Sequence, residues 1–317
     1  MKHIWLIGAG LMAQEYFKVL STLNVSISVV GRGSKSAKKF KNATNFDCVE
    51  GGLEKFLSKK PKVVEFAIVA VNVRYLTKVS KQLISYGIKS ILIEKPGGLN
   101  KNDIESLYES SITHKANIYI AYNRRFYQSV DLAQRMIDED GGVSSFSFNF
   151  TELIYRLEEL QVPLVERKML LLYNSSHVID LAFFLGGVPN TIKCYHNDNS
   201  KINWHQTSSI FSGSGVTRNG ALFSYGANWE SPGRWELIIN TLKRKLIFCP
   251  LEELKIQEHK SFDTIKHRFD KETDIDNKYK PGLFKLVEAF LHKNNIFLCR
   301  IEEMRQLTDI YYKIANY

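Results

Sequence analysis

A short apolar segment followed by closely spaced small residues stands at the start of the chain and constrains its fold more than any other feature. Residues 4–7 read Ile-Trp-Leu-Ile, and residues 8–13 read Gly-Ala-Gly-Leu-Met-Ala. The apolar residues that follow recur at helical spacing up to Leu23. A buried strand, a glycine-rich turn and a helix, in this order, are typical of the first βαβ unit of a dinucleotide-binding Rossmann domain.

The small residues of this turn each meet a separate physical demand. Gly8 permits the tight turn, Gly10 lets backbone N–H groups approach a pyrophosphate, and Ala13 lets helix and strand pack closely. Leu11 and Met12 lie where the helix begins, and the helix N-terminus adds a partial positive charge. We therefore predict that these five residues bind a dinucleotide; an ordinary glycine-rich turn is the alternative.

The second predicted strand, residues 25–30, ends in a basic loop. A domain that prefers NAD usually has Asp or Glu at this strand's end, about 20 residues past the glycines, to hold the adenosine ribose. Here Arg32, Ser34 and Lys35 offer hydrogen-bond donors that suit a 2′-phosphate. We expect NADP(H) as the preferred cofactor and NAD(H) as the second choice; the alternative is a basic loop that binds nothing.

Strands and helices alternate up to residue 122. Residues 63–71 form a near-continuous apolar run, typical of a central parallel strand that is buried on both faces. Its carboxyl end, Val71 and Asn72, is expected at the sheet edge where ligands bind. The alternation predicts an α/β fold over residues 1–122, a doubly wound Rossmann domain.

Beyond Asn123 the pattern changes to strands, several of them with two-residue alternation. The predicted strands are residues 143–150, 191–195, 207–212, 220–228, 235–240 and 245–248. Helices are expected at residues 129–137, 176–185, 282–292 and 302–312, and a long polar loop with strand fragments at 259–280. Residues 123–317 are therefore predicted to form an α+β domain for substrate binding and oligomerisation, with a large, mostly antiparallel open sheet.

Composition limits the other classes. The 43 basic and 33 acidic residues give a net charge of +10, but these charges form no tail and no arginine-rich helix, so we expect no nucleic-acid partner. There is no 18-residue apolar run for a membrane span, and a chain that opens in a strand leaves no room for a signal peptide. The four cysteines are far apart, so we expect thiols in a reducing cytoplasm and no metal site.

A lysine stands directly after the predicted strand at residues 90–94. Pro96 restricts Lys95 to an extended conformation and so aims its side chain. A lysine at the carboxyl end of a parallel strand can polarise a substrate carbonyl. We predict that Glu94 and Lys95 lie at the cofactor and that Lys95 is catalytic; the alternative is a solvated loop lysine.

A histidine lies at the predicted start of the helix at residues 176–185. The residues before it, Asn174, Ser175 and Ser176, are all capping types. His177 would then lie in the first turn, where the helix dipole keeps the imidazole neutral and ready to exchange a proton. Asp180 shares its helix face and could orient it. The alternative is a capping histidine with no catalytic role.

Two further segments combine arginines with aromatic residues. They are residues 123–126, Asn-Arg-Arg-Phe, and residues 229–235, Trp-Glu-Ser-Pro-Gly-Arg-Trp. Such residues suit an anionic or sugar-like substrate, and salt bridges with sheet packing are the alternative. The predicted substrate-binding residues are Asn123, Arg124, Asn174 and Asp180.

With these motifs in view, the chain resembles the glucose–fructose oxidoreductase / inositol dehydrogenase (Gfo/Idh/MocA) family. The matching motifs are Gly-Ala-Gly-Leu-Met-Ala at 8–13, Glu-Lys-Pro at 94–96, and His177-x-x-Asp180 leading into a helix. The resemblance implies NAD(P)-dependent redox chemistry at a sugar or cyclitol carbon, with Lys95 and His177 in catalytic positions. It also implies an oligomer, a homodimer or homotetramer, formed through the open sheet.

Residues 123–126 and 231–235 resemble members found in surface-polysaccharide gene clusters. One departure from the family pattern concerns the residues before His177. Many members have Asp-x-Gly-x-His, whereas this chain has Tyr173 and Ser175 at the first and third positions. Tyr173 could replace the aspartate as a hydroxyl donor, the enzyme could favour reduction, or redox activity could be weak or lost.

The sequence thus predicts a cytoplasmic NAD(P)-dependent oxidoreductase that acts on a sugar, cyclitol or nucleotide-sugar. An imine reductase of the same fold and a non-catalytic cofactor-binding regulator are the alternatives.

Overall fold

The computed structural model describes residues 1–159, 162–197, 200–270, 275–293 and 296–317. Their contacts divide the chain into two compact units. The first unit contains residues 1–126 and 275–308, and the second contains residues 127–274 and 309–317. None of the described helices is long and apolar enough to cross a lipid bilayer.

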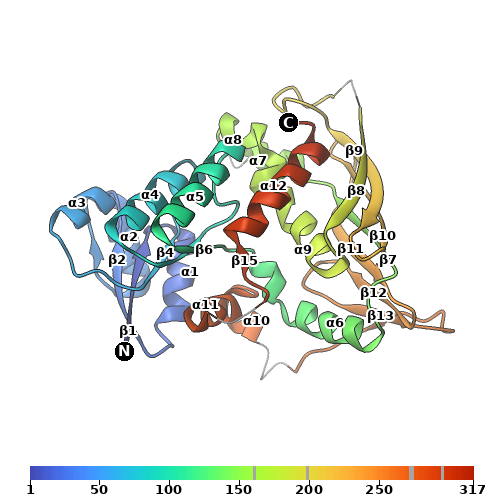
Figure 1. Ribbon diagram of the computed structural model, residues 1–317, viewed down its shortest axis with the longest axis horizontal. Helices are drawn as coiled ribbons and strands as arrows, with labels where there is room; N and C mark the ends of the chain where they lie inside the picture. The colour runs from blue at the N-terminus through green and yellow to red at the C-terminus, as the bar shows by residue number, and fades with distance from the viewer. Residues whose placement is uncertain (160–161, 198–199, 271–274, 294–295) are drawn as a thin grey trace. The chain divides into compact units, whose positions relative to one another are not determined.

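A mostly parallel sheet forms the centre of the first unit (Figure 1). Within the described residues it has seven strands in the order β15-β6-β5-β4-β1-β2-β3. Their bounds are β1 Lys2–Ile7, β2 Val25–Val30, β3 Cys48–Val49, β4 Phe66–Val69, β5 Ser90–Ile93, β6 Asn117–Ile120 and β15 Cys299–Arg300. Only the β15–β6 pair is antiparallel among these described strands. The order 3-2-1-4-5-6 confirms the predicted Rossmann fold, whose ligand edge lies at the carboxyl ends of β1 and β4, where the strand order reverses.

Helices connect these strands. Their bounds are α1 Leu11–Leu20, α2 Ser34–Thr44, α3 Gly52–Ser58, α4 Val73–Tyr86, α5 Lys101–His114, η1 Asn123–Phe126, α10 Ile275–Lys278, α11 Leu283–His292 and α12 Ile301–Ala315. Strands β4 and β5 are buried along their whole length, as expected for the centre of a parallel sheet. Strand β4 is shorter than the apolar run at 63–71, because Val63 is exposed and lies before the paired segment.

Residues 275–308 return to the first unit. Phe290 of α11 packs edge to face against Phe66 of β4 and Tyr119 of β6, with ring centroids 5.4 and 5.9 Å apart. Strand β15 then adds an antiparallel edge to β6. The sequence predicts a single boundary after Tyr122, whereas the contact units differ from it by adding 123–126 and 275–308 to the first unit.

An open sheet dominates the second unit (Figure 1). Its eight strands within the described residues follow the order β14-β13-β12-β11-β7-β10-β9-β8. Their bounds are β7 Ser145–Phe150, β8 Pro189–His196, β9 Ile210–Thr217, β10 Leu222–Asn228, β11 Trp235–Asn240, β12 Arg244–Phe248, β13 Lys255–Glu258 and β14 Ile265–Lys266. Among these described pairs only β7 and β10 run parallel, so the expected mostly antiparallel sheet is confirmed.

One face of this sheet is covered by α9. The helices of the second unit are α6 Gln128–Glu139, α7 Ile154–Glu159, α8 Leu164–Lys168, the π-helical turn η2 Leu171–Ser175, and α9 Ser176–Gly186. Alternate residues of β7, Phe146, Phe148 and Phe150, are buried, and Phe183 of α9 contacts the first two edge to face. The predicted loop at 259–280 contains β14 and α10, and its residues 271–274 lie outside the described part.

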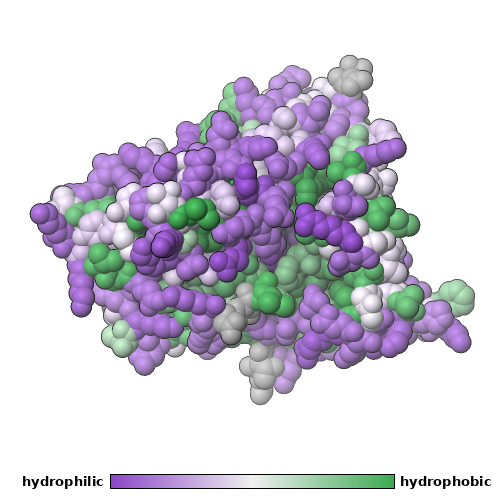
Figure 2. All heavy atoms as spheres, in the orientation of Figure 1, coloured by the Kyte–Doolittle hydropathy of each residue, from purple (hydrophilic) through white to green (hydrophobic). Residues whose placement is uncertain are grey.

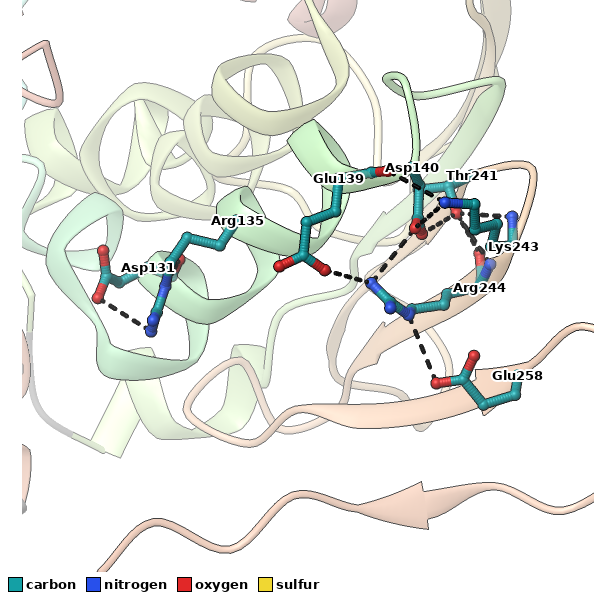
Figure 3. Close-up of polar contacts among 8 residues, drawn as sticks. All are labelled: Asp131, Arg135, Glu139, Asp140, Thr241, Lys243, Arg244 and Glu258. Atoms are coloured by element: carbon teal, nitrogen blue, oxygen red, sulfur yellow. Dashed lines mark hydrogen bonds and ion pairs between the residues drawn. The ribbon is translucent and has the colours of Figure 1, made fainter.

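A buried carboxylate joins α6 to the β11–β12 hairpin (Figure 3). Asp140, whose side chain is fully buried, accepts a hydrogen bond of 2.7 Å from the Thr241 hydroxyl. Arg244 and Lys243 place cationic nitrogens 3.3 and 3.8 Å from its other oxygen. One hydroxyl donor and two cationic side chains therefore offset the desolvation of this carboxylate.

Candidate functional site

A cavity of about 680 Å³ opens at the carboxyl ends of β1, β2 and β4. It is lined by six of the residues predicted to bind a cofactor: Gly8, Gly10, Arg32, Lys35, Val71 and Asn72. The other predicted cofactor residues do not line it: Leu11, Met12, Ala13, Ser34, Glu94 and Lys95. The cavity thus lies at the switch point where doubly wound sheets bind ligands.

The two glycines of the turn differ in what they serve. Gly8 has a φ of +127°, and a Cβ there would stand 2.1 Å from the carbonyl oxygen of Ala70. The fold itself therefore requires a glycine at this position. Gly10 has a φ of −87°, and within the described residues a Cβ there would meet no heavy atom within 4 Å. The small size of Gly10 leaves space in the cavity, as a closely approaching pyrophosphate requires.

Helix α1 begins at this turn without a side-chain cap among the described residues. Its N-cap is Gly10, and the first bond of the helix runs from the Gln14 N–H to the Gly10 carbonyl, at 3.1 Å. The N–H groups at the start of α1 are suited to bind an anion, because a helix leaves them without intrahelical acceptors. Ala13 is fully buried, in agreement with its predicted packing role, while Leu11 is 81% exposed.

The basic end of the cavity has an aromatic partner that the sequence analysis did not identify. The Arg32 guanidinium lies over the ring of Tyr75, 4.8 Å from its centroid. Hydrogen bonding to Arg32, together with its charge, lowers the pKa of Tyr75. Lys39 and Lys78 also line the cavity. Helical spacing after Asn72 could have indicated Tyr75 and Lys78, because positions three and six residues on share one face of α4.

Asn72 fixes the start of α4. Its side-chain oxygen accepts a hydrogen bond from the Arg74 N–H at 3.1 Å, which is an N-cap interaction. Asn72 therefore has a structural role as well, and together with Val71 it lines the cavity.

Glu94 and Lys95 lie at the carboxyl end of β5. The Tyr16 hydroxyl donates to the Glu94 carboxylate at 2.7 Å. Burial raises the pKa of Glu94, although this bond and the charges of Lys95 and Lys280 oppose the rise. The Lys95–Pro96 peptide bond is cis, and Lys95 is half-buried.

The arginine-containing segment at 123–126 forms the short helix η1 of the first unit. Asn123 donates from its side-chain nitrogen to the Pro281 carbonyl at 2.8 Å. Arg125 is 1% exposed and pairs with Glu303 at 2.7 Å. Arg125 therefore agrees with the alternative interpretation of this segment, a salt bridge with packing. Arg124 is half-buried and remains a candidate for substrate binding.

Helix α9 begins at Ser176 as predicted, but the expected side-chain cap before His177 is wrong. Ser175 has helical dihedrals of −62° and −23° and makes no side-chain cap, and the π-helical turn η2 runs directly into α9. The Ser176 hydroxyl instead donates to the Leu172 carbonyl at 2.8 Å. Since helical backbone precedes His177, the argument that an open helix N-terminus keeps its imidazole neutral does not apply.

The capping-type side chains bind a carboxylate that the sequence analysis did not identify. Glu152 follows the end of β7 and is 6% exposed. One of its oxygens accepts the Ser175 hydroxyl at 2.6 Å, and the other accepts the Asn174 side-chain amide at 2.9 Å. The polar pair Thr151-Glu152, directly after an alternating strand, is the signal that could have indicated it.

The second unit brings the remaining predicted residues onto η2 and α9. His177 is 7% exposed, and its ring lies 6.2 Å from that of Trp235 at the start of β11. Asp180 is fully buried one turn further on. Tyr173 is half-buried, and its pKa is raised by burial and by the charge of Glu166.

The aromatic segment at 229–235 is built into the same part of the second unit. Trp229 is 4% exposed and donates from its indole nitrogen to the Phe150 carbonyl at 3.1 Å. A Cβ on Gly233 would approach Thr151 to 2.7 Å. Trp229 and Gly233 therefore serve sheet packing, whereas Arg234 is exposed.

Comparison with known proteins gives one family match. Residues 2–122 match the family described as GFO_IDH_MocA, oxidoreductase family, NAD-binding Rossmann fold. No curated protein matches the chain significantly.

Several solved structures share the fold over nearly the whole chain. An oxidoreductase from Desulfitobacterium hafniense, described as NADPH-dependent, has 17% identity and a TM-score of 0.76, covering 99% of this chain and 94% of that one. UDP-N-acetylglucosamine 3-dehydrogenase GnnA from Acidithiobacillus ferrooxidans has 13% identity and a TM-score of 0.74, covering 99% and 97%. Levoglucosan dehydrogenase, in complex with NADH and L-sorbose, has 15% identity and a TM-score of 0.76, covering 100% and 96%.

At such identities the structural likeness establishes the fold alone. The family match adds the class of enzyme, because it covers the glycine turn, the cavity and Lys95. Residues 2–122 are thus similar to the Gfo/Idh/MocA oxidoreductases, a family with an NAD-binding Rossmann fold.

Proposed function

We propose that the protein is an NAD(P)-dependent dehydrogenase or reductase that acts on a sugar, cyclitol or nucleotide-sugar. The observation that carries the proposal is the cavity at the carboxyl ends of β1, β2 and β4, where Gly10 leaves space that the fold itself does not need. The structural relatives named for levoglucosan and for UDP-N-acetylglucosamine support a sugar-like substrate.

The charges of the cavity support NADP(H) as the preferred cofactor. Arg32, Lys35 and Lys39 line it beyond the end of β2, where an NAD-preferring domain usually has an acidic residue. Contact with the Tyr75 ring would orient the Arg32 guanidinium toward a bound anion. Gly8, Gly10 and the first turn of α1 would hold the pyrophosphate.

When bound, the nicotinamide supplies or accepts a hydride. The side chains of this chain would handle the oxygen and the proton. Lys95, beside the Glu94 carboxylate, would donate a hydrogen bond to the substrate oxygen and so polarise its carbonyl. His177 would give or take the proton, with the Tyr173 hydroxyl as a second donor. Arg124, Asn123, Asn174 and Asp180 remain the substrate-binding candidates.

Cofactor titration followed by a substrate survey tests this proposal. Purified protein is titrated with NADPH and separately with NADH while its fluorescence is followed. Keto-sugars, sugars, cyclitols and nucleotide-sugars are then assayed through the absorbance of the reduced nicotinamide. We expect tighter binding of NADPH and cofactor-linked turnover of at least one substrate class. Binding without any turnover would favour the cofactor-binding regulator, and the absence of binding would overturn the proposal.

We also propose a homodimer or homotetramer formed through the open sheet, in a reducing cytoplasm. Tyr195 of β8 and Leu222 of β10 are 63% and 60% exposed on this sheet, which supports a surface for a second copy. Light scattering after size-exclusion chromatography measures the mass. A monomer at micromolar concentration would contradict the proposed assembly.

A further inference from the structure

The backbone that carries Glu152 is held firmly at the end of β7. The Thr151 hydroxyl accepts the Asn228 N–H at 3.0 Å, and the Thr151 N–H donates to the Asn149 side chain at 2.8 Å. Gly233 approaches the Thr151 side chain closely from the segment before β11. Bonds from β10 and contacts from the segment before β11 therefore fix the position from which the Glu152 side chain extends.

The Glu152 carboxylate binds two consecutive residues of one turn. Its partners are the Ser175 hydroxyl, which is fully buried, and the Asn174 amide, at 2.6 and 2.9 Å. Hydrogen bonds to a carboxylate are stronger than those between neutral groups, and burial strengthens them further. π-Helical turns are rare and lie frequently at functional sites, and in η2 this carboxylate binds two of the five residues of the turn.

The same turn is held at its other end. The Leu171 N–H donates to the Tyr317 hydroxyl at 3.4 Å. Between these two attachments lies Tyr173, and directly after them comes His177 in the first turn of α9. A change in η2 would therefore move both proposed proton-transferring groups while α9 stays packed on the sheet through Phe183.

We propose that Glu152 is a positioning residue of the reaction: through Ser175 and Asn174 it holds η2 in the π-helical form that places Tyr173 and His177. The inference rests on the proposed function, since it concerns how these two groups are placed for proton transfer. Glu152 would act through the turn, whose Asn174 and Ser175 it binds. Position 173 is a tyrosine in this chain, and the buried carboxylate at this turn comes from Glu152, which follows β7.

Substitutions at both ends of the Glu152–Ser175 bond test the proposal. Glu152→Ala and Ser175→Ala should each lower kcat about tenfold or more, because small misplacements of catalytic groups reduce turnover strongly. NADPH affinity should stay within about twofold of the wild type, since neither residue lies in the cofactor cavity. The double variant should be no slower than the slower single variant, because both changes remove one interaction.

Glu152→Gln separates positioning from a requirement for charge. Glutamine keeps the side-chain length, accepts from Ser175, and donates to a flipped Asn174 amide. It should therefore restore most of the kcat lost in Glu152→Ala. Ser175→Ala removes a single hydroxyl and keeps the test valid if Glu152→Ala fails to fold.

Asp140→Asn is the matched control. Asp140 is also a buried carboxylate of the second unit that accepts a hydroxyl hydrogen bond, from Thr241 at 2.7 Å (Figure 3). This variant should lower the melting temperature and leave kcat unchanged at temperatures where it is folded. Wild-type kcat in Glu152→Ala, losses that multiply in the double variant, or an equal loss in Asp140→Asn would overturn the inference.

A readout without turnover separates this inference from the proposed function. In ¹H–¹⁵N spectra, Glu152→Ala and Ser175→Ala should shift the His177 imidazole signals in the same direction, and Asp140→Asn should leave them in place. A wild-type protein that turns over no substrate would contradict the proposed function alone. Unmoved His177 signals in both variants would contradict the positioning role alone.

Discussion

Gly10 and Gly8 are two residues apart in the sequence, yet the physical reasons for their small size differ. For Gly8 the reason is the Ala70 carbonyl and a positive φ, both of which belong to the fold. For Gly10 the reason is that a larger side chain would occupy space within the cavity. A glycine whose removal leaves the fold intact is a stronger indication of a ligand than one that the turn requires.

This contrast predicts opposite effects of two alanine substitutions. Gly10→Ala should leave the melting temperature close to that of the wild type and weaken NADPH binding about tenfold or more, because a methyl group would occupy the path of the pyrophosphate. Gly8→Ala should destabilise the fold by about 1–3 kcal/mol or more. Thermal denaturation and cofactor titration measure the two effects. Unchanged NADPH affinity in Gly10→Ala would remove the cavity from the proposed cofactor site.

Arg32 determines the expected choice between the two nicotinamide cofactors. Arg32→Ala should weaken NADPH binding about 10- to 100-fold, because hydrogen bonds to a charged group contribute about 1.5–3 kcal/mol each. NADH, which lacks the 2′-phosphate, should bind almost as before. Lys38→Ala removes a positive charge from α2, the helix that follows Arg32 in the chain, at a position that does not line this cavity, and is the control. Equal losses for both cofactors would assign Arg32 to general attraction of anions.

Lys95 is the residue of the first unit on which turnover should depend most. Lys95→Ala should reduce kcat by about two to four orders of magnitude, the usual range for a group that assists proton transfer or polarises a substrate. NADPH affinity should remain within a few-fold of the wild type, because Lys95 does not line the cofactor cavity. Steady-state kinetics measure kcat, and cofactor titration measures the affinity for NADPH. Turnover near the wild-type level would exclude Lys95 from the mechanism.

At the scale of elements, a neutral histidine attaches the end of the chain to η2. The Nδ1–H of His205 donates to the Ser208 carbonyl at 2.7 Å, so its Nε2 accepts the Tyr317 hydroxyl at 2.9 Å. The same hydroxyl accepts the Leu171 N–H. Burial lowers the pKa of His205 from 6.5 to about 4. Protonation of Nε2 would remove the acceptor of the Tyr317 hydroxyl. The hydrogen bonds that connect His205 to Leu171 through Tyr317 depend on this acceptor.

The consequence is a loss of stability in mild acid. Between pH 6.5 and 4 the unfolded chain binds a proton at this histidine that the folded chain does not, so the free energy of unfolding falls as the pH is lowered. The contribution of His205 that is lost across this window is about 3 kcal/mol. Urea unfolding at a series of pH values measures it. His205→Phe should flatten the slope, whereas the exposed His259→Phe should not; equal slopes in all three proteins would refute the assignment.

The elements also indicate how far sequence reasoning extends. Apolar runs and helical spacing predicted the alternation up to residue 122, because parallel strands and their covering helices are encoded locally. The η2 turn was not predicted, since Asn174 and Ser175 have the composition of a cap and their partner Glu152 lies more than 20 residues earlier. Tyr75 was missed for the related reason that its contact with Arg32 joins two helix–strand units.

At the scale of the whole molecule, the first unit is assembled from two distant parts of the chain. Residues 275–308 contribute an edge strand and Phe290, whose ring packs on Phe66 and Tyr119. Sequence patterns could not assign them, because an amphipathic helix shows that it covers a surface and not which one. Hydrophilic side chains cover most of the visible face of the protein, with hydrophobic side chains between them (Figure 2).

This construction predicts that a fragment of residues 1–126 is incomplete. Without α11 the faces of Phe66 and Tyr119 are exposed, and large apolar patches promote association. We expect the fragment to bind a hydrophobic dye and to aggregate, while residues 1–126 joined by a flexible linker to 275–308 should be monomeric and bind NADPH. Sedimentation measures how far the fragment and the linked protein associate, and dye fluorescence measures their exposed apolar surface. A soluble, dye-negative fragment would show that residues 275–308 are dispensable for the first unit.

The return of residues 275–308 also sets an order of events at the ribosome. Synthesis proceeds from the N-terminus, so the strands β1 to β6 emerge first and wait for the segment that covers them. During that interval the whole second unit up to residue 274 is translated. The rings of Phe66 and Tyr119 therefore lack their Phe290 contact throughout that interval, and slow translation between residues 127 and 274 lengthens it.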